Sequence, residues 1–198
     1  MAGQAFPVVL DLAGRTCLLV GGGAEAERKA AALERAGAVL RRSLDFGPEM
    51  LAGVVLVIVA DTAPGVAAAA ARAAHEHRIL VNVVDQPALC SFTMPAIVDR
   101  GPVVVAISTS GTAPALAKLL RTVLDRLLPR RLGDLAQLAG RLRPVVARRL
   151  ADPSARRAFW ARVFRSNVAL RALTGRPAAG ALLAALDLAA PAPPPRKP

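Results

Sequence analysis

The sequence has 198 residues, enough for one domain with an appendage or for two small domains. Hydrophobic residues make up 54% of it, so it can bury a core, whereas only 3% are aromatic and tyrosine is absent. This scarcity argues against a single-stranded nucleic-acid platform, in which bases stack on aromatic rings. No apolar run reaches the length of a membrane span, and the amino terminus lacks the pattern of a signal peptide. We therefore expect a cytoplasmic protein that binds neither membrane nor nucleic acid.

The formal net charge is +12, with arginine far more frequent than lysine. Such an excess attracts polyanions, including small substrates with many carboxylates or phosphates. A base composition that favours arginine and alanine codons would give the same excess, and both explanations stay open at this point. Cys17 and Cys90 have neither the spacing of a disulfide framework nor that of a metal site, so we expect reduced thiols and no metal ligands.

The first half of the chain alternates between apolar strands and helices. The predicted strands are residues 16–20, 39–44, 54–60, 79–84 and 102–107, and the predicted helices are residues 25–36 and 64–77. Strands that are apolar on both faces and alternate with helices indicate an α/β fold with a Rossmann-like parallel sheet. Only nine residues, 45–53, separate the second and third strands. A helical crossover needs at least ~10–12 residues, so the sheet is abbreviated here or the connection is not a helix.

After residue 112 the pattern becomes helical and rich in arginine. The predicted amphipathic helices are residues 114–128, 132–150 and 154–164. Pro129, Pro144 and Pro153 mark breaks or kinks between or within them. The alanine- and proline-rich stretch 189–198 is predicted to be a disordered tail.

A glycine motif follows the first strand. Residues 21–26 read G-x-G-x-x-A, with a predicted strand directly before them and a helix directly after, as a dinucleotide-binding turn requires. Gly21 permits the tight turn, Gly23 lets the backbone approach a pyrophosphate, and Ala26 is small enough for the helix to pack on the sheet. Gly22, between the two motif glycines, is a further candidate for cofactor binding. The alternative is an ordinary glycine turn of an α/β domain.

The end of the second strand carries charges of both signs. Asp45 there would suit the ribose hydroxyls of NAD, whereas Arg41 and Arg42 would suit the 2′-phosphate of NADP. The sequence leaves the choice between NAD and NADP open.

Polar residues also follow two later strands. Asp85 comes directly after the strand 79–84, and the carboxyl ends of parallel strands line the ligand crevice. The other candidate ligands near strand ends are Asn82, Ser91, Phe92, Ser110, Gly111 and Thr112. The alternatives are that Asp85 caps a turn and that the Ser110-Gly111-Thr112 loop merely starts a helix.

Several stretches together resemble one family. They are residues 18–23 (LLVGGG), 26–30 (AERKA), 82–85 (NVVD), 91–100 (SFTMPAIVDR), 110–114 (SGTAP) and 156–160 (RRAFW). In this order they resemble the precorrin-2 dehydrogenase/sirohydrochlorin ferrochelatase family, the amino-terminal module of siroheme synthase. The resemblance implies NAD-dependent oxidation of precorrin-2 to sirohydrochlorin in siroheme biosynthesis, and many members then insert Fe²⁺ as a second substrate.

The resemblance also implies roles for individual residues. Cofactor contacts of the family map onto Ala24 and Glu25 at the glycine turn and onto Leu44 and Asp45 after the second strand. Its acid/base aspartate maps onto Asp85. Dehydrogenation transfers a hydride to the nicotinamide and a proton to a base, a role that a carboxylate at this strand end suits. Precorrin-2 carries eight carboxylates, which would account for the many arginines.

The family plan predicts the organisation of the whole chain. It comprises an NAD-binding Rossmann-like domain (1–113), a helical segment that forms a homodimer (114–150), a small helical domain that covers the anionic tetrapyrrole (151–188) and a tail (189–198). The short connection 45–53 departs from this plan, because the family usually has a further strand and helix there. The alternative function is therefore a non-catalytic dinucleotide- or tetrapyrrole-binding protein with a degenerate cofactor lobe.

Overall fold

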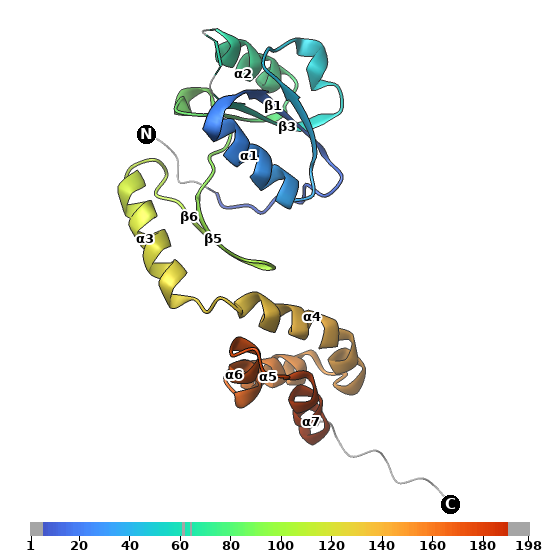
Figure 1. The fold of residues 1–198 in the computed structure, drawn as a ribbon. Coiled ribbons are helices and arrows are strands. Elements are labelled where there is room, and N and C mark those ends of the chain that lie inside the picture. Colours follow the sequence, from blue (N-terminus) through green and yellow to red (C-terminus); the bar gives the residue numbers. More distant parts are fainter. Residues whose placement is uncertain (1–5, 61, 64, 190–198) are drawn as a thin grey trace, which may run out of the picture. The chain divides into compact units, whose positions relative to one another are not determined.

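The computed structural model describes residues 6–60, 62–63 and 65–189. The chain forms two compact units, residues 1–94 and residues 95–198 (Figure 1). The sequence-based division at residue 113 differs from this one, because residues 95–113 fold with the second unit. Of the predicted tail, only Ala189 lies among the described residues, where it ends the last helix.

The first unit is built on a four-stranded parallel sheet with the strand order β2-β1-β3-β4. Its elements are β1 (Thr16–Gly21), α1 (Gly23–Arg35), β2 (Val39–Ser43), β3 (Val54–Ala60), α2 (Val66–Glu76) and β4 (Leu80–Val83). In the central strands, Cys17 of β1 pairs with Leu40 on one side and Leu56 on the other. The Rossmann-like parallel sheet predicted from the sequence is confirmed.

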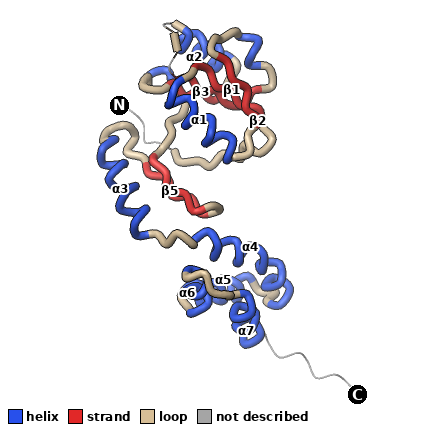
Figure 2. The backbone as a smooth tube through the Cα atoms, in the orientation of Figure 1, coloured by secondary structure: helices blue, strands red, loops and turns tan. Residues whose placement is uncertain are grey.

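The two helices cover opposite faces of this sheet (Figure 2). On one face, Ala26, Ala30 and Leu33 of α1 pack against Leu19 and Ile58. On the other, the buried alanines of α2 pack against side chains of β1, β3 and β4, and these alanines are Ala67, Ala70, Ala71, Ala73 and Ala74. Alternate residues of each central strand face opposite helices, so both faces are apolar, as in buried parallel sheets.

The connection between β2 and β3 contains no α-helix, as its length predicted. It holds a single 3-10 turn, η1 (Pro48–Leu51). Leu51 is buried in the core on the α2 side of the sheet, and Phe46 packs against the same cluster. The short connection therefore crosses from the edge strand β2 to the far side of β1 and still contributes to the core.

The predicted fifth strand of the parallel sheet is wrong. Residues Val103–Ile107 form β6, which pairs antiparallel with β5 (Ala96–Arg100) in a separate two-stranded sheet. β5 was not among the strands predicted from the sequence. Only Gly101 and Pro102 separate the two, and a link this short permits a hairpin but no crossover to a parallel strand. Gly101 has a φ of +70°, and its N–H donates to Asp99 Oδ1 at 2.8 Å.

The other regular elements among the described residues of the second unit are helices. They are α3 (Pro114–Leu127), α4 (Leu132–Arg149), α5 (Pro153–Phe164), α6 (Asn167–Leu173) and α7 (Ala179–Ala189). The first three match the predicted helices, with Pro144 inside α4, whereas α6 and α7 were not predicted individually. Phe159, Leu182 and Leu186 lie in the core that α4 to α7 share. Among the described residues no helix has the length and apolar character needed to cross a membrane.

Candidate active site

The glycine turn joins β1 to α1. Gly21 has a φ of +113°, and a Cβ at this position would lie 1.6 Å from the carbonyl oxygen of Ala60, so only glycine fits. Gly22 precedes the helix, and no described side chain caps that end. Gly23, at a φ of +76°, and Ala24 are exposed, and Ala26 is fully buried beneath them against the sheet. The turn thus has the local geometry that the dinucleotide motif predicted, with the amino terminus of a helix open to an anion.

Residues that follow β2 lie beside this turn. Leu44 Cδ2 would lie 3.4 Å from a Cβ placed on Gly22, and the Leu44 side chain is 74% exposed. Asp45 is also exposed, and its backbone N–H donates to Ser43 Oγ at 3.2 Å. The structure therefore brings Leu44, which the resemblance implied as a cofactor contact, next to the glycine turn.

The two arginines of β2 are already engaged within the chain. Arg42 forms an ion pair with Glu27 of α1, and Arg41 donates to the carbonyl oxygen of Ala52 at 3.0 Å. Asp45 has no ion pair among the described residues. A carboxylate there suits the ribose hydroxyls of NAD, whereas a 2′-phosphate would need a guanidinium released from its partner.

Asp85 lies in the turn that follows β4. It is exposed, and its φ of +59° is in the left-handed region, which aspartate tolerates better than most residues. The N–H of Gln86 closes the turn on the carbonyl oxygen of Val83 at 3.3 Å. Backbone strain of this kind is frequent at functional sites. Among the other non-glycine residues that the structure describes, only Ser110, also a predicted site residue, and Arg78 after α2 have a φ in this region.

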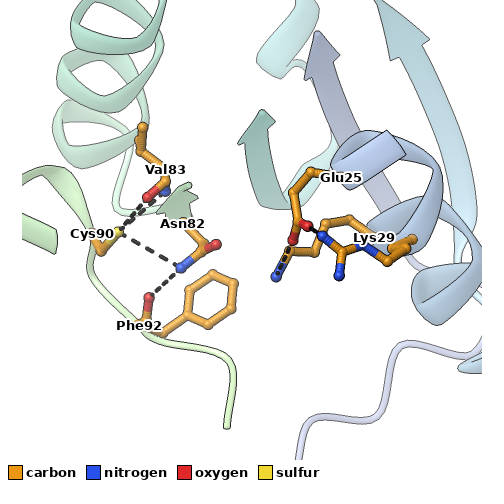
Figure 3. Close-up of polar contacts among 7 residues, drawn as sticks. Glu25, Lys29, Asn82, Val83, Cys90 and Phe92 are labelled. Atoms are coloured by element: carbon orange, nitrogen blue, oxygen red, sulfur yellow. Dashed lines mark hydrogen bonds and ion pairs between the residues drawn. The ribbon is translucent and has the colours of Figure 1, made fainter. Parts of the chain in front are cut away.

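Lys29 is a functional candidate that was not among the residues predicted from the sequence. Its side chain is only 17% exposed, and Nζ lies 3.3 Å from Glu25 Oε1 one turn earlier on α1, where Glu25 also pairs with Arg28 (Figure 3). Burial lowers the pKa of the Lys29 ammonium, the charge of Arg28 lowers it further, and the Asp85 carboxylate opposes both effects. The Lys29 ammonium, on the helix of the glycine turn, thus lies within electrostatic reach of Asp85. The i,i+4 spacing from Glu25 was the available sequence signal.

Asn82, predicted as a substrate ligand, is buried and bonded within the chain (Figure 3). Its Nδ2 donates to the carbonyl oxygen of Phe92 at 3.0 Å and to Cys90 Sγ at 3.6 Å. Cys90 Sγ also accepts from the N–H of Val83 at 3.2 Å. These contacts fasten the segment after the 3-10 turn η2 (Pro87–Leu89) to β4 and so fix the strand end that carries Asp85.

Ser91 has a similar role in the structure. Its Oγ accepts from the N–H of Val81 at 2.8 Å and donates to the carbonyl oxygen of Val81 at 3.3 Å. Phe92 is half-buried and packs against the core on the α1 side of the sheet. The roles of Asn82, Ser91 and Phe92 toward a substrate stay predictions, whereas their bonds and packing within the chain are evident.

The loop with Ser110, Gly111 and Thr112 belongs to the second unit, whereas the residues above belong to the first. The N–H of Ser110 donates to Ser108 Oγ at 3.1 Å, and the N–H of Ala113 donates to Thr109 Oγ1 at 3.3 Å. The loop therefore caps itself before α3 begins at Pro114. Its exposed residues remain candidates for contact with an anion.

Acidic, histidine and cysteine side chains do not gather into a metal site in the described part of the chain. No group of three or more of them there could hold a metal ion. Cys17 is fully buried, and burial raises the pKa of its thiol.

Comparisons with known proteins identify both units. Residues 8–43 and 39–96 match the family described as "Putative NAD(P)-binding". Residues 131–186 match the family described as "Sirohaem synthase dimerisation region".

Two relatives with similar sequences are both named "Siroheme synthase". The chain is 40% identical over 194 residues to "Siroheme synthase" of Methylobacillus flagellatus, which covers 87% of this chain and 42% of that protein. It is 42% identical over 209 residues to "Siroheme synthase" of Azotobacter vinelandii, covering 95% of this chain and 45% of the relative. The chain thus spans less than half the length of these relatives.

A solved structure supports the same assignment of fold. "SirC, precorrin-2 dehydrogenase" superposes with a TM-score of 0.66 at 22% identity, over 93% of this chain and all of the other. The two proteins therefore share their fold over 93% of this chain. The chain belongs to the precorrin-2 dehydrogenase/sirohydrochlorin ferrochelatase family.

Proposed function

We propose that this chain oxidises precorrin-2 to sirohydrochlorin with NAD⁺. The proposal rests on three features that lie at one edge of the parallel sheet in the first unit. The glycine turn, Asp45 and Asp85 follow the parallel strands β1, β2 and β4, whose carboxyl ends meet at one edge of the sheet. That edge is where ligands bind in open α/β sheets.

The residues at this edge fit a dinucleotide. The uncapped amino terminus of α1, at Gly22 and Gly23, would receive the pyrophosphate, and exposed Asp45 would accept hydrogen bonds from the ribose. Leu44 would pack against the cofactor beside the turn. When bound, NAD⁺ supplies the hydride acceptor. Because Arg41 and Arg42 are engaged within the chain, we favour NAD over NADP.

Asp85 would take the proton in this reaction. Precorrin-2 loses a hydride and a proton, and the products are sirohydrochlorin, NADH and one proton passed on to solvent. The exposed carboxylate at the end of β4 can receive that proton and release it. The ammonium of Lys29 lies within electrostatic reach of this carboxylate, and the bonds of Asn82 and Ser91 hold the strand end in place.

The test compares wild type with Asp85→Asn in anaerobic oxidation of precorrin-2, followed by absorbance with and without NAD⁺. Asparagine also tolerates the left-handed backbone, so this change removes the base without adding strain. We expect NAD⁺-dependent turnover by wild type, a loss of about a hundredfold or more in Asp85→Asn, and unchanged affinity for NAD⁺. Equal turnover by the two proteins would remove Asp85 from the mechanism.

The same assay addresses the alternative function. A folded wild type that binds NAD⁺ or the tetrapyrrole without turnover would be a binding protein with a degenerate cofactor lobe. Asp45→Asn is expected to weaken NAD⁺ binding and leave the fold unchanged, because Asp45 is exposed. If Asp45→Asn binds NAD⁺ as tightly as wild type, the ribose is held elsewhere.

We also propose that the chain acts as a homodimer. The apolar stripe of α3 is exposed at Leu116, Leu119, Leu120, Val123 and Leu127, whose spacing places them on one face of the helix. Exposed apolar patches of this kind mark interaction surfaces. A second copy of the chain is the partner that fits a family defined partly by its dimerisation region.

Two finer expectations accompany the main proposal. Insertion of Fe²⁺ into sirohydrochlorin would be a second reaction of the same chain, and anaerobic formation of siroheme from sirohydrochlorin and Fe²⁺ above the uncatalysed rate tests it. A cytoplasmic setting fits the free thiols of Cys17 and Cys90.

A further inference from the structure

A pocket opens between α4 and α5 of the second unit. It has a volume of about 680 Å³, which lies within the range of small-ligand sites. The side chains that matter for its chemistry are Arg143, Ala147, Arg156, Arg157, Trp160 and Phe164. We call it the Arg-Trp pocket.

One wall of the Arg-Trp pocket is aromatic. The rings of Trp160 and Phe164 stack, with centroids 5.6 Å apart and planes inclined by 20°. Phe159, which is fully buried in the helical core, meets Trp160 edge-on at 5.3 Å. Trp160 thus contacts the helical core through Phe159. The stacked pair offers a flat apolar surface to a planar ligand.

Guanidinium groups border this surface. Arg156 is committed to the fold, since its Nη1 donates to the carbonyl oxygens of Leu150 at 2.9 Å and Ala151 at 2.6 Å. Arg143 and Arg157 are exposed and form no hydrogen bond or ion pair with the described residues.

One carboxylate lies within electrostatic reach of Arg157. The pKa of Asp152 is lowered first by hydrogen bonds from Ser154 and Ala155 and to a smaller extent by Arg157. The Asp152 carboxylate is engaged as the cap of α5, where it accepts from the N–H of Ala155 at 2.8 Å. Arg157 therefore keeps its hydrogen-bond donors for another partner.

We propose that the Arg-Trp pocket binds one carboxylate-bearing edge of the tetrapyrrole, with the macrocycle against Trp160 and Phe164 and its carboxylates paired with Arg143 and Arg157. The proposal rests on the proposed function for the identity of the ligand. A flat apolar wall bordered by free guanidinium groups matches a planar ring with acidic side chains. Arg143 and Arg157 would act as substrate-positioning residues.

The probe is uroporphyrin, a stable planar macrocycle with eight carboxylates. Trp160 is the only tryptophan and the chain has no tyrosine, so intrinsic emission excited at long ultraviolet wavelengths reports on this residue. Energy transfer to a porphyrin acts over long distances, so the measured quantity is the dissociation constant and not the depth of quenching. The test variant is Arg143→Gln/Arg157→Gln.

The matched control is Arg148→Gln/Arg162→Gln. Both of its positions lie on the same two helices, are exposed and lie outside the pocket, and the change in net charge is the same. We expect the test variant to bind uroporphyrin at least about tenfold more weakly than wild type, and the control to bind within about twofold of wild type. Thermal unfolding shows that each variant is folded.

Equal affinity of the two variants for uroporphyrin would contradict the proposed role of the pocket, since only net charge would then affect binding. Absence of wild-type binding would also overturn it. Precorrin-2 oxidation separates this outcome from failure of the proposed function. If the test variant shows NAD⁺-dependent turnover with an unchanged KM for precorrin-2, the proposed role of the pocket is wrong and the proposed function stands. A higher KM for precorrin-2 at similar kcat supports the role of the pocket. If uroporphyrin binding depends on Arg143 and Arg157 but wild type shows no turnover, the proposed role of the pocket is supported and the proposed dehydrogenase function is contradicted.

Discussion

The two units of the chain differ in their charge. Residues 1–94 contain 8 lysines and arginines against 9 aspartates and glutamates, whereas residues 95–198 contain 18 against 5. The entire positive excess therefore belongs to the second unit. A bias in base composition would act on both halves, so it does not explain a difference of this kind. The charge follows position in the fold and therefore points to a task of the second unit.

The pairing of charges differs in the same way. Around α1 of the first unit, Arg28, Lys29 and Arg42 each have an acidic partner, either Glu25 or Glu27. Among the described residues of the second unit, three arginines form ion pairs, namely Arg100 with Asp125, Arg131 with Asp134 and Arg149 with Asp187. In the first unit the positive charges near the glycine turn are thus paired with acidic side chains. The second unit has an excess of positive charge that is not paired in this way. We infer that the first unit serves the cofactor and that the second attracts the polyanionic substrate.

The largest expected effect concerns the geometry of the first unit. Gly21→Ala would place a Cβ 1.6 Å from the Ala60 carbonyl oxygen at a φ of +113°. Overpacking and backbone strain together are expected to cost about 4 kcal/mol in the free energy of unfolding. Chemical denaturation followed by circular dichroism measures this. Gly14→Ala is the control, because Gly14 has a φ of +68° but open space around its Cβ position. Equal losses would mean that φ alone, and not the contact with Ala60, sets the cost.

A second prediction concerns the apolar surface of the second unit. Leu119→Glu places a charge in the α3 stripe, where Leu119 is 60% exposed. Burying that charge in a homodimer is expected to weaken association by about a hundredfold or more. Analytical ultracentrifugation over a range of concentrations measures it. Lys118→Glu, on the opposite side of the same helix, changes the charge more but should leave the dimer intact. Dissociation by both variants would assign the effect to net charge.

The ionic strength of the solution is expected to affect the binding of the two ligands to different extents. Raising the ionic strength is expected to weaken uroporphyrin binding by about tenfold, because the exposed arginines of the second unit are screened. The affinity for NAD⁺ should change by less than about threefold, since the site that we propose for it consists of backbone N–H groups and Asp45. Titration of each ligand at low and high salt gives both numbers. Equal salt dependence for the two ligands would remove the proposed division of tasks.

The smallest effect comes from Cys17 in the core of the first unit. Burial raises the pKa of its thiol, so the folded state keeps the proton at a pH where the unfolded chain has lost it. The resulting stability is complete below the ordinary thiol pKa of about 8.5 and is lost as pH rises through the higher folded-state pKa. Wild type should therefore lose stability in this alkaline range more steeply than Cys17→Ala. Parallel slopes in urea unfolding at several pH values would contradict the prediction.

The sequence by itself determined the core of the first unit and its turn. Alternating apolar strands and helices specify a covered parallel sheet, and Gly21 to Gly23 between a strand and a helix specify the turn. These patterns are local, because positive φ and apolar runs depend on neighbouring residues. The length of the connection 45–53 likewise sufficed to predict that it holds no α-helix. The position of Asp85 after a strand followed from the same pattern.

The tertiary structure decided what depends on distant partners. Residues 102–107 read as one more buried strand, and only their pairing with residues 96–100 made them a hairpin. The sequence does not show whether Asn82 and Ser91 contact a ligand or a neighbouring backbone. In the structure their side chains form hydrogen bonds between β4 and the segment that follows η2. The fold brings Lys29 within electrostatic reach of Asp85, and it places Arg143 of α4 and Trp160 of α5 in the lining of one pocket. Side-chain partners are set by three-dimensional proximity, which a one-dimensional pattern does not encode.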